Sequence, residues 1–236
     1  MKTAQEKLVL AGMVLAIVVL AGVLFWLSTS KNQGGISLSK SFAAELHEGI
    51  RQEWEINQAL VLDLDEEPVP AQNREPFFLL QNVARAYQHE LEWLKEKENE
   101  SFLELQTENN WAAQNALKKE IGWFVLFPYL QIISSQTVET VSNPAFDREQ
   151  VVLQAEQELP FIKPVSLLPA ESVQQFAAES GLTKEQVREG IQNAVSLFVS
   201  FKKTEFENSV TGFEKAVMAQ QLLSWRFLLE AVAQEN

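Results

Sequence analysis

Residue types that commonly do chemistry are sparse in this chain, which has two histidines and no cysteine. The lack of cysteine excludes disulfides, thiolate metal sites and a cysteine nucleophile. His47 and His89 are each followed by glutamate, but the zinc-peptidase pattern His-Glu-x-x-His fails because Arg51 and Trp93 stand at its second histidine. The di-iron pattern Glu-x-x-His fails because alanine stands three residues before each histidine. His47 and His89 thus remain metal or acid–base candidates only if the fold unites them, and the alternative is two exposed or hydrogen-bonded histidines.

Other catalytic and cofactor-binding patterns are incomplete. The sequence contains no Gly-x-Ser-x-Gly, no phosphate-cradling glycine loop and no dinucleotide fingerprint. The acidic segment 63–75 has the length of a calcium loop, but Pro68 replaces its glycine and Arg74 replaces its final glutamate. We therefore expect a solvated acidic loop there, and we assign no catalytic residue, cofactor or metal to the chain.

The most informative segment is an apolar run, LVLAGMVLAIVVLAGVLFWL, at residues 8–27. About 20 apolar residues in a helix cross a bilayer core of roughly 30 Å. A secretory signal has a shorter apolar stretch of about 7–15 residues before a small-x-small cleavage site. We expect an uncleaved transmembrane helix at 8–27, between a short stub (1–7) and a polar linker (28–40). A cleaved signal and a buried core helix are the alternatives.

The orientation of this helix is less strongly marked. Lysines lie on both sides of the apolar run, so the positive-inside rule gives little asymmetry. The short basic stub favours a cytoplasmic N-terminus with the main domain on the extracytoplasmic side. Gly12 and Ala16 form a small-xxx-small pair that can let two membrane helices approach closely, which leaves a homo-oligomer open.

Residues 41–236 predict an all-α domain, a multi-helix bundle. Good helix formers fill long stretches, glycine and proline are scarce, and no alternating β-branched run indicates a strand. Prolines gather at a few places, so a sub-boundary could fall near 142–147 or 160–169. The net charge of −13 disfavours nucleic acid as a partner, because an acidic surface repels phosphates.

The clearest helical periodicity lies in the segment 76–106. Apolar residues recur there at spacings of 3, 4, 3, 4 and 3, which is typical of a seam on one helix face. The pattern slips after Leu94, where Glu98 and Ser101 come next, and Phe102 with Leu105 resumes it in another phase. The seam either packs inside the bundle or receives a partner helix. Its members are Phe77, Leu80, Ala84, Tyr87, Leu91 and Leu94.

Further helices are expected over about 42–62, 111–127, 148–158, 184–206 and 210–233. The apolar segment 121–133 would be about 20 Å long as a helix, which is too short to cross a bilayer. We expect a buried core helix there, with a continuation beyond Pro128 left open. An interfacial patch at the membrane surface is the alternative.

The segment FAAESGLTKEQVREGI, at 176–191, looks like the helix-turn-helix of bacterial repressors. The matching small residue, turn glycine, apolar residue, cap and core valine are Ala177, Gly181, Leu182, Thr183 and Val187. The resemblance implies two helices joined by a tight turn and, in that family, DNA binding. The sequence departs at Gly190, where an apolar core residue is usual, and its second helix mixes acidic with basic residues. We expect a capped helical corner without DNA binding.

Together these features predict a non-enzymatic, single-pass membrane protein that acts through protein–protein contacts. Candidate roles are scaffold, assembly factor or accessory subunit of a membrane complex. A tethered domain meets membrane partners at a raised effective concentration, so modest interfaces suffice. The alternative is a membrane-tethered sensor or small-ligand-binding module, and a metal-dependent enzyme using His47 and His89 is a third reading.

Overall fold

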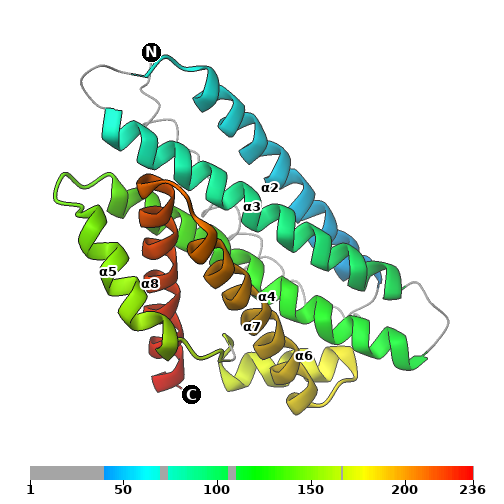
Figure 1. The fold of residues 1–236 in the computed structure, drawn as a ribbon. Helices are drawn as coiled ribbons and strands as arrows, with labels where there is room; N and C mark the ends of the chain where they lie inside the picture. The colour runs from blue at the N-terminus through cyan, green and yellow to red at the C-terminus, as the bar shows by residue number, and fades with distance from the viewer. Residues whose placement is uncertain (1–39, 70–73, 106–109, 166, 236) are drawn as a thin grey trace.

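The computed structural model describes residues 40–69, 74–105, 110–165 and 167–235, and these ranges are all-α, without a strand (Figure 1). The fold-class prediction is confirmed for this part of the chain. The expected transmembrane helix at 8–27, the stub before it and the linker up to residue 39 lie outside the described residues.

Seven α-helices and one short 3-10 helix make up the described chain. Their bounds are α2 Lys40–Glu66, α3 Arg74–Leu105, α4 Asn110–Val141, α5 Arg148–Glu158, η1 Leu159–Phe161, α6 Ala170–Ser180, α7 Lys184–Asn208 and α8 Gly212–Glu235. The long helices α3 and α4 have 32 residues each, so each is about 48 Å long.

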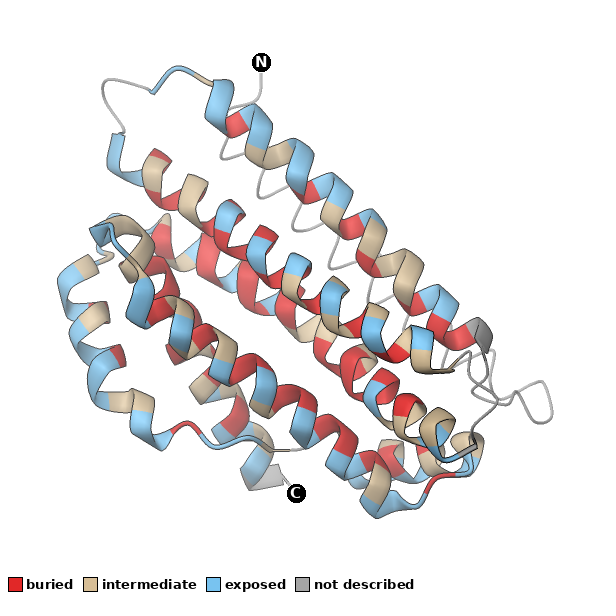
Figure 2. Cartoon of the chain, turned by 45° about the vertical axis from the view of Figure 1, so that its right-hand side comes forward, coloured by how far each residue is buried: buried red, intermediate tan, exposed pale blue. Residues whose placement is uncertain are grey.

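The helices pack around α3 and α4, which lie side by side with α2 along them (Figure 1). Helix α7 packs against α4, α8 contacts α3, α4, α5 and α7, and α6 packs on α7. Figure 2 shows that the buried residues follow the faces that the helices turn toward one another. The core cluster runs from Phe42 to Leu229 and includes side chains on both sides of 142–147 and 160–169.

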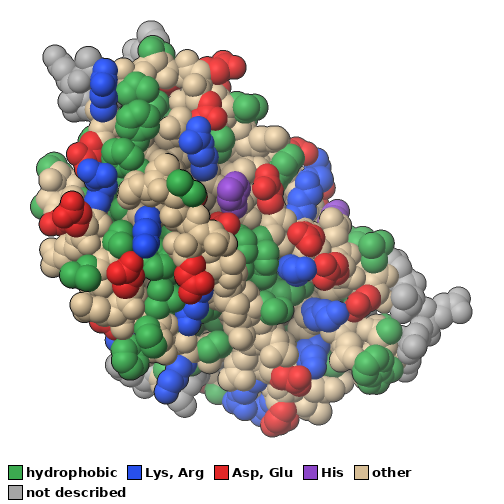
Figure 3. Space-filling model, viewed as in Figure 1, with side chains coloured by type: hydrophobic (Ala, Val, Ile, Leu, Met, Phe, Trp, Pro, Cys, Tyr) green, Lys and Arg blue, Asp and Glu red, His purple; other side chains and the backbone are tan. Residues whose placement is uncertain are grey.

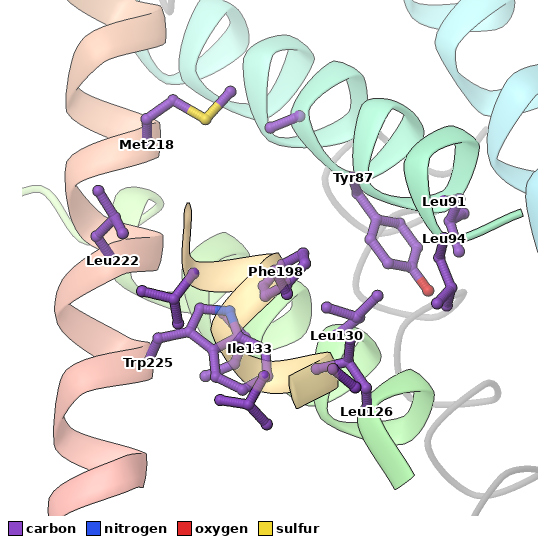
Figure 4. Close-up of a cluster of buried hydrophobic side chains, with 14 of the residues drawn as sticks. Tyr87, Leu91, Leu94, Leu126, Leu130, Ile133, Phe198, Met218, Leu222 and Trp225 are labelled. Carbon is purple, nitrogen blue, oxygen red and sulfur yellow. The ribbon is translucent and has the colours of Figure 1, made fainter. Parts of the chain in front are cut away.

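All six residues of the predicted seam are buried in the chain's own core. Figure 4 shows Tyr87, Leu91 and Leu94 directed from α3 toward side chains of α4 and α7. In this conformation the seam packs inside the chain's own bundle, and it has no exposed surface for a partner helix.

The apolar pattern slips after Leu94, but the buried face of α3 does not. Glu98 and Ser101, the next positions in phase, are fully buried, whereas Leu103 is 67% exposed and Phe102 is only half-buried. The buried stripe of α3 thus keeps its phase and changes from apolar to polar, because neighbouring helices supply polar partners at this end of the bundle.

Helix α4 is longer than expected and continues through Pro128 to Val141. Proline removes one backbone donor, and the buried Leu126 and Leu130 hold the helix in the core on either side of it. Among the described residues, one stretch, Trp111–Val141, is long and apolar enough to cross a membrane. Most of its apolar window, 61%, is buried inside the bundle, as in the core helix of a soluble domain.

The predicted helical corner is present between α6 and α7. Gly181 has φ of 72°, a left-handed conformation that glycine adopts readily. Thr183 caps α7 by accepting from Gln186 N, while Gln186 accepts from Thr183 N, which completes a capping box.

Gly190 departs from the helix-turn-helix pattern because it faces α4. A Cβ on Gly122 of α4 would lie 2.5 Å from Gly190 O, so the two helices cross at backbone distance there. The position that would carry a core side chain in a repressor serves a different interhelical contact in this chain.

The expected acidic loop is partly wrong as well. Helix α2 extends to Glu66, so Asp63 and Asp65 belong to its last turns. Asp65 pairs with Arg85 at 2.7 Å and accepts from Gln81 at 2.8 Å, and these contacts tie the end of α2 to α3.

Candidate functional site

The two histidines lie in separate ion pairs. His47 Nδ1 on α2 is 2.7 Å from Glu98 Oε2 on α3, whereas His89 Nδ1 on α3 is 3.8 Å from Glu205 Oε2 on α7. Glu205 raises the pKa of His89. Because Glu98 follows His89 by nine residues on one helix, the two pairs are about 13 Å apart along its axis.

The structure therefore does not bring His47 and His89 into one site. In the described ranges, no group of three or more histidine, aspartate or glutamate side chains is arranged to hold a metal ion. The His47 ring instead stacks on Phe102, with ring centroids 5.0 Å apart.

The His47–Glu98 pair adjoins a buried polar cluster centred on Ser101. Trp123 Nε1 of α4 donates to Ser101 Oγ at 3.1 Å, and Ser101 Oγ lies 2.5 Å from Glu120 Oε1, also of α4. Ser101 Oγ also lies 3.0 Å from the backbone oxygen of Glu98. We call His47, Glu98, Ser101, Glu120 and Trp123 the carboxyl cluster.

Burial governs the electrostatics of the carboxyl cluster. Glu98 and Glu120 are both completely buried, and one oxygen of each, Glu98 Oε1 and Glu120 Oε2, has no hydrogen-bond partner among the described residues. Burial raises the pKa of Glu120 to about 8 against the Ser101 hydrogen bond, which favours the charged form, and Glu98 adds a smaller upward effect. Burial also raises the pKa of Glu98, against the opposing effect of His47. The cluster can therefore hold protons at neutral pH.

A groove opens beside this cluster between α3, α4 and α7. It has a volume of about 700 Å³, and its lining includes Trp111, Trp123, Gly190, Ala194 and Leu197. We call it the α3–α4–α7 groove. Trp123 belongs to both the groove and the carboxyl cluster, so its indole links the groove lining to Ser101.

Ion pairs flank the α3–α4–α7 groove. Lys118 pairs with Glu189 at 2.9 Å, and Lys119 pairs with Glu104 at 2.8 Å. On the face drawn in Figure 3, hydrophobic side chains lie among charges of both signs. The groove therefore offers apolar surface beside mixed charge, which suits neither a polyanion nor a polycation.

A second buried polar group joins α3, α7 and α8. Lys202 Nζ lies 2.8 Å from Glu90 Oε1, with both side chains fully buried, and it donates to Gln221 Oε1 at 2.8 Å. Burial raises the pKa of Glu90, and the Lys202 ammonium opposes that rise. Lys202 Nζ also lies 3.0 Å from Met218 Sδ, which Figure 4 places at the edge of the hydrophobic cluster.

A third buried polar group connects α2 to α3. Tyr87 donates to Glu53 Oε1 at 2.9 Å, and Asn57 Nδ2 donates to Gln88 Oε1 at 2.9 Å. Burial raises the pKa of Glu53 to about 7, although the Tyr87 hydroxyl favours its charged form. These groups fix the register of the two helices.

The sequence did not single out Glu98, Ser101, Glu120 or Lys202 as site residues. For two of them a signal was present, since Glu98 and Ser101 occupy the next seam positions after Leu94. Lys202 follows the buried Phe198 by four residues on α7, where an inward side chain is also expected. A polar or charged residue in phase with an apolar stripe is the pattern that indicates such buried polar groups.

Comparison with known proteins adds no relative: no protein-family model matches the chain, and neither curated proteins nor solved structures give a match.

Proposed function

We propose that the chain is a single-pass membrane protein whose helical bundle acts by binding another protein. The apolar run at 8–27 supplies the anchor, and the polar linker up to residue 40 holds the bundle near the bilayer. The basic stub favours a cytoplasmic N-terminus and an extracytoplasmic bundle. Scaffold, assembly factor and accessory subunit of a membrane complex are the roles that this arrangement suits.

The observation that carries protein binding is the α3–α4–α7 groove. Along α7 its lining extends from Gly190 to Leu197, which is about two helical turns. The small Ala112 would let a partner backbone approach closely, and two large apolar side chains of the lining, Trp111 and Leu197, are 73% and 52% exposed. These dimensions suit a short amphipathic helix of a partner that carries charges of both signs at its edges.

Photocrosslinking in the native membrane tests this proposal. A photoreactive amino acid at Leu197 should give one discrete adduct with a membrane-associated protein. The matched control is Leu153 on α5, which is 57% exposed and does not line the groove. An absence of adduct at 197, or the same adduct from 153, contradicts binding in the groove.

The groove volume also favours a second function, that of a small-ligand-binding module. Ligand pockets commonly have volumes of about 300–1,000 Å³ and apolar, aromatic walls. The groove has about 700 Å³ and includes two tryptophans, Trp111 and Trp123. A flat, largely apolar molecule is the ligand class that such walls would accept.

Native mass spectrometry separates the two functions. A bound small molecule should accompany the purified full-length chain and be lost in Asn193→Trp, which fills the groove from an exposed position. If no small molecule is released by either protein, the ligand-binding function is contradicted, while the crosslinking result stands by itself.

A further inference from the structure

The hydroxyl of Ser101 has more hydrogen-bond partners than it has protons to donate. A serine hydroxyl has one proton to donate and two lone pairs to accept with. Ser101 Oγ accepts from Trp123 Nε1 at 3.1 Å and donates to Glu120 Oε1 at 2.5 Å. The backbone oxygens of Lys97 and Glu98, 3.3 and 3.0 Å from Ser101 Oγ, compete for the same hydroxyl proton. A proton on Glu120 would let all of these contacts form together.

Burial requires the same protonation state. An ionised carboxylate that leaves water without full pairing is costly, so a buried carboxyl neutralises instead. Glu120 is completely buried, and its second oxygen has no hydrogen-bond partner among the described residues. The neighbouring Glu98 is equally buried and has the same deficit at Oε1, so two ionised carboxylates there would repel each other with little screening.

The carboxyl cluster also spans three helices, and its His47 end is exposed to solvent. Glu98 and Ser101 belong to α3, Glu120 to α4, and His47 to α2. The His47 side chain is 32% exposed, so it can exchange protons between solvent and the carboxyl cluster. Its Nδ1 lies 2.7 Å from Glu98 Oε2, and this hydrogen bond needs one proton between the two atoms. Near the same end of α2, Phe42 packs on Phe124 of α4 with ring centroids 4.7 Å apart.

We propose that the carboxyl cluster is a proton-operated latch on the first part of α2. With a proton on Glu120, the His47–Glu98 and Ser101–Glu120 contacts tie α2, α3 and α4 together. Loss of that proton places two facing carboxylates inside the bundle, and residues 42–50 of α2 separate from α3 and α4 to let water reach them.

The charged groups that face the latch come from three helices. Glu98 of α3 faces Glu120 of α4, and His47 of α2 faces Glu98 from the other side. From α7, Glu189 approaches this end, but it pairs with Lys118 near the surface. No described cation contacts Glu120 to hold its ionised form, so the loss of its proton has to be relieved by movement.

Infrared spectroscopy of the full-length chain in detergent tests the protonation state. At about pH 6.5, the carboxylic-acid C=O band of the wild type should be larger than that of Glu120→Gln, while Glu53 and Glu90 contribute equally to both. The matched control Glu45→Gln, which changes an exposed carboxyl on α2, should keep the wild-type band. At about pH 9 the difference between wild type and Glu120→Gln should be lost. A band equal in the two proteins at about pH 6.5, or a difference that persists at about pH 9, overturns the proposal.

Hydrogen exchange at residues 42–50 tests the movement. Variants are compared at one pH, so the intrinsic exchange rate cancels. At about pH 9, these amides should exchange of order 10-fold faster in the wild type and in Glu45→Gln than in Glu120→Gln. At about pH 6.5 the three proteins should agree.

Equal protection of residues 42–50 in all three proteins at about pH 9 would overturn the latch. Should Glu120→Gln fail to fold, Glu98→Gln removes the same repulsion from the other side and must show the same slow exchange at about pH 9. The change in the wild-type infrared band must appear in either case.

Discussion

At the scale of single residues, the buried Lys202 is the side chain whose removal should cost most. Its partner Glu90 is completely buried and would be left as an uncompensated charge. Breaking a buried pair in this way costs about 3–5 kcal/mol. Urea unfolding of Lys202→Met should show a loss of that size, whereas Lys203→Met at the half-exposed neighbouring position should stay within about 0.5 kcal/mol of wild type.

The double variant Glu90→Leu with Lys202→Met should recover most of that loss. Replacement of both charges by apolar side chains of similar volume is often neutral or stabilising. If the double variant is as unstable as Lys202→Met, the free energy lies in packing around Lys202 and the unpaired-charge explanation is wrong.

Glu53 makes stability depend on pH. Burial raises its folded-state pKa to about 7, above the ordinary value of 4.5. Its contribution to the free energy of unfolding is therefore complete below about pH 4.5 and is lost as pH rises through about 7. Relative to wild type, Glu53→Gln should gain roughly 3 kcal/mol over that interval, because each pKa unit corresponds to about 1.4 kcal/mol.

Urea unfolding at several pH values measures this difference. The control Glu66→Gln, at an exposed position near the end of α2, should follow the wild-type curve. A constant offset between Glu53→Gln and wild type across the interval would show that Glu53 has the same pKa in the folded and unfolded chains.

At the scale of helices, the crossing of α4 and α7 depends on two glycines. A Cβ at Gly122 would lie 2.5 Å from Gly190 O, closer than real Cβ contacts allow. Gly122→Ala should therefore force the helices apart and cost about 1–3 kcal/mol, as overpacking does. Thermal unfolding should show a clear drop in Tm.

Gly49 provides the matched control for this change. A Cβ there would meet Phe127 Cε1 at 3.8 Å, an ordinary contact. Gly49→Ala should be stabilising by up to about 1 kcal/mol, because alanine has the higher helix propensity. A similar loss of stability in both variants would contradict a special role for the α4–α7 crossing.

The capping box at the start of α7 gives another helix-scale prediction. Thr183→Ala removes the side-chain acceptor for Gln186 N and should cost about 1 kcal/mol. Thr204→Ala in the same helix removes only a bond back to Ser200 O and should be nearly neutral. Equal effects of the two changes would mean that the cap does not stabilise α7.

Helices were predictable where apolar spacing and end signals agreed. Residues 148–158 match α5, and the Thr183 cap marks the start of α7, because the capping chemistry is local. The end of α4 stayed open in the sequence because Pro128 breaks a local rule that core packing overrides. The phase of α3 was misread because Glu98 and Ser101 look like surface residues until α2 and α4 supply partners.

The candidate site was less predictable than the fold for the same reason. His47 could be selected by residue type, but its partner Glu98 is 51 positions away, and Glu120 resembles any helical glutamate. Only the packing of three helices shows that His47, Glu98 and Glu120 belong to one largely buried cluster.

At the scale of the whole molecule, two segments are candidates for a membrane-spanning helix. The run at 8–27 has the length and composition of an anchor. Helix α4 also has a suitable stretch, Trp111–Val141, but 61% of its apolar window is buried in the bundle, and it carries the buried Glu120. A single-pass protein anchored by 8–27 leaves α4 in the bundle core.

Membrane fractionation of the full-length chain and of a 40–236 fragment tests this claim most directly. We expect the full-length chain to stay with membranes after an alkaline carbonate wash, and the fragment to be folded and in the supernatant. The anchor assignment is contradicted if the full-length chain, with its N-terminus intact, is found in the supernatant. It is equally contradicted if the fragment resists extraction, since α4 would then hold the protein in the membrane.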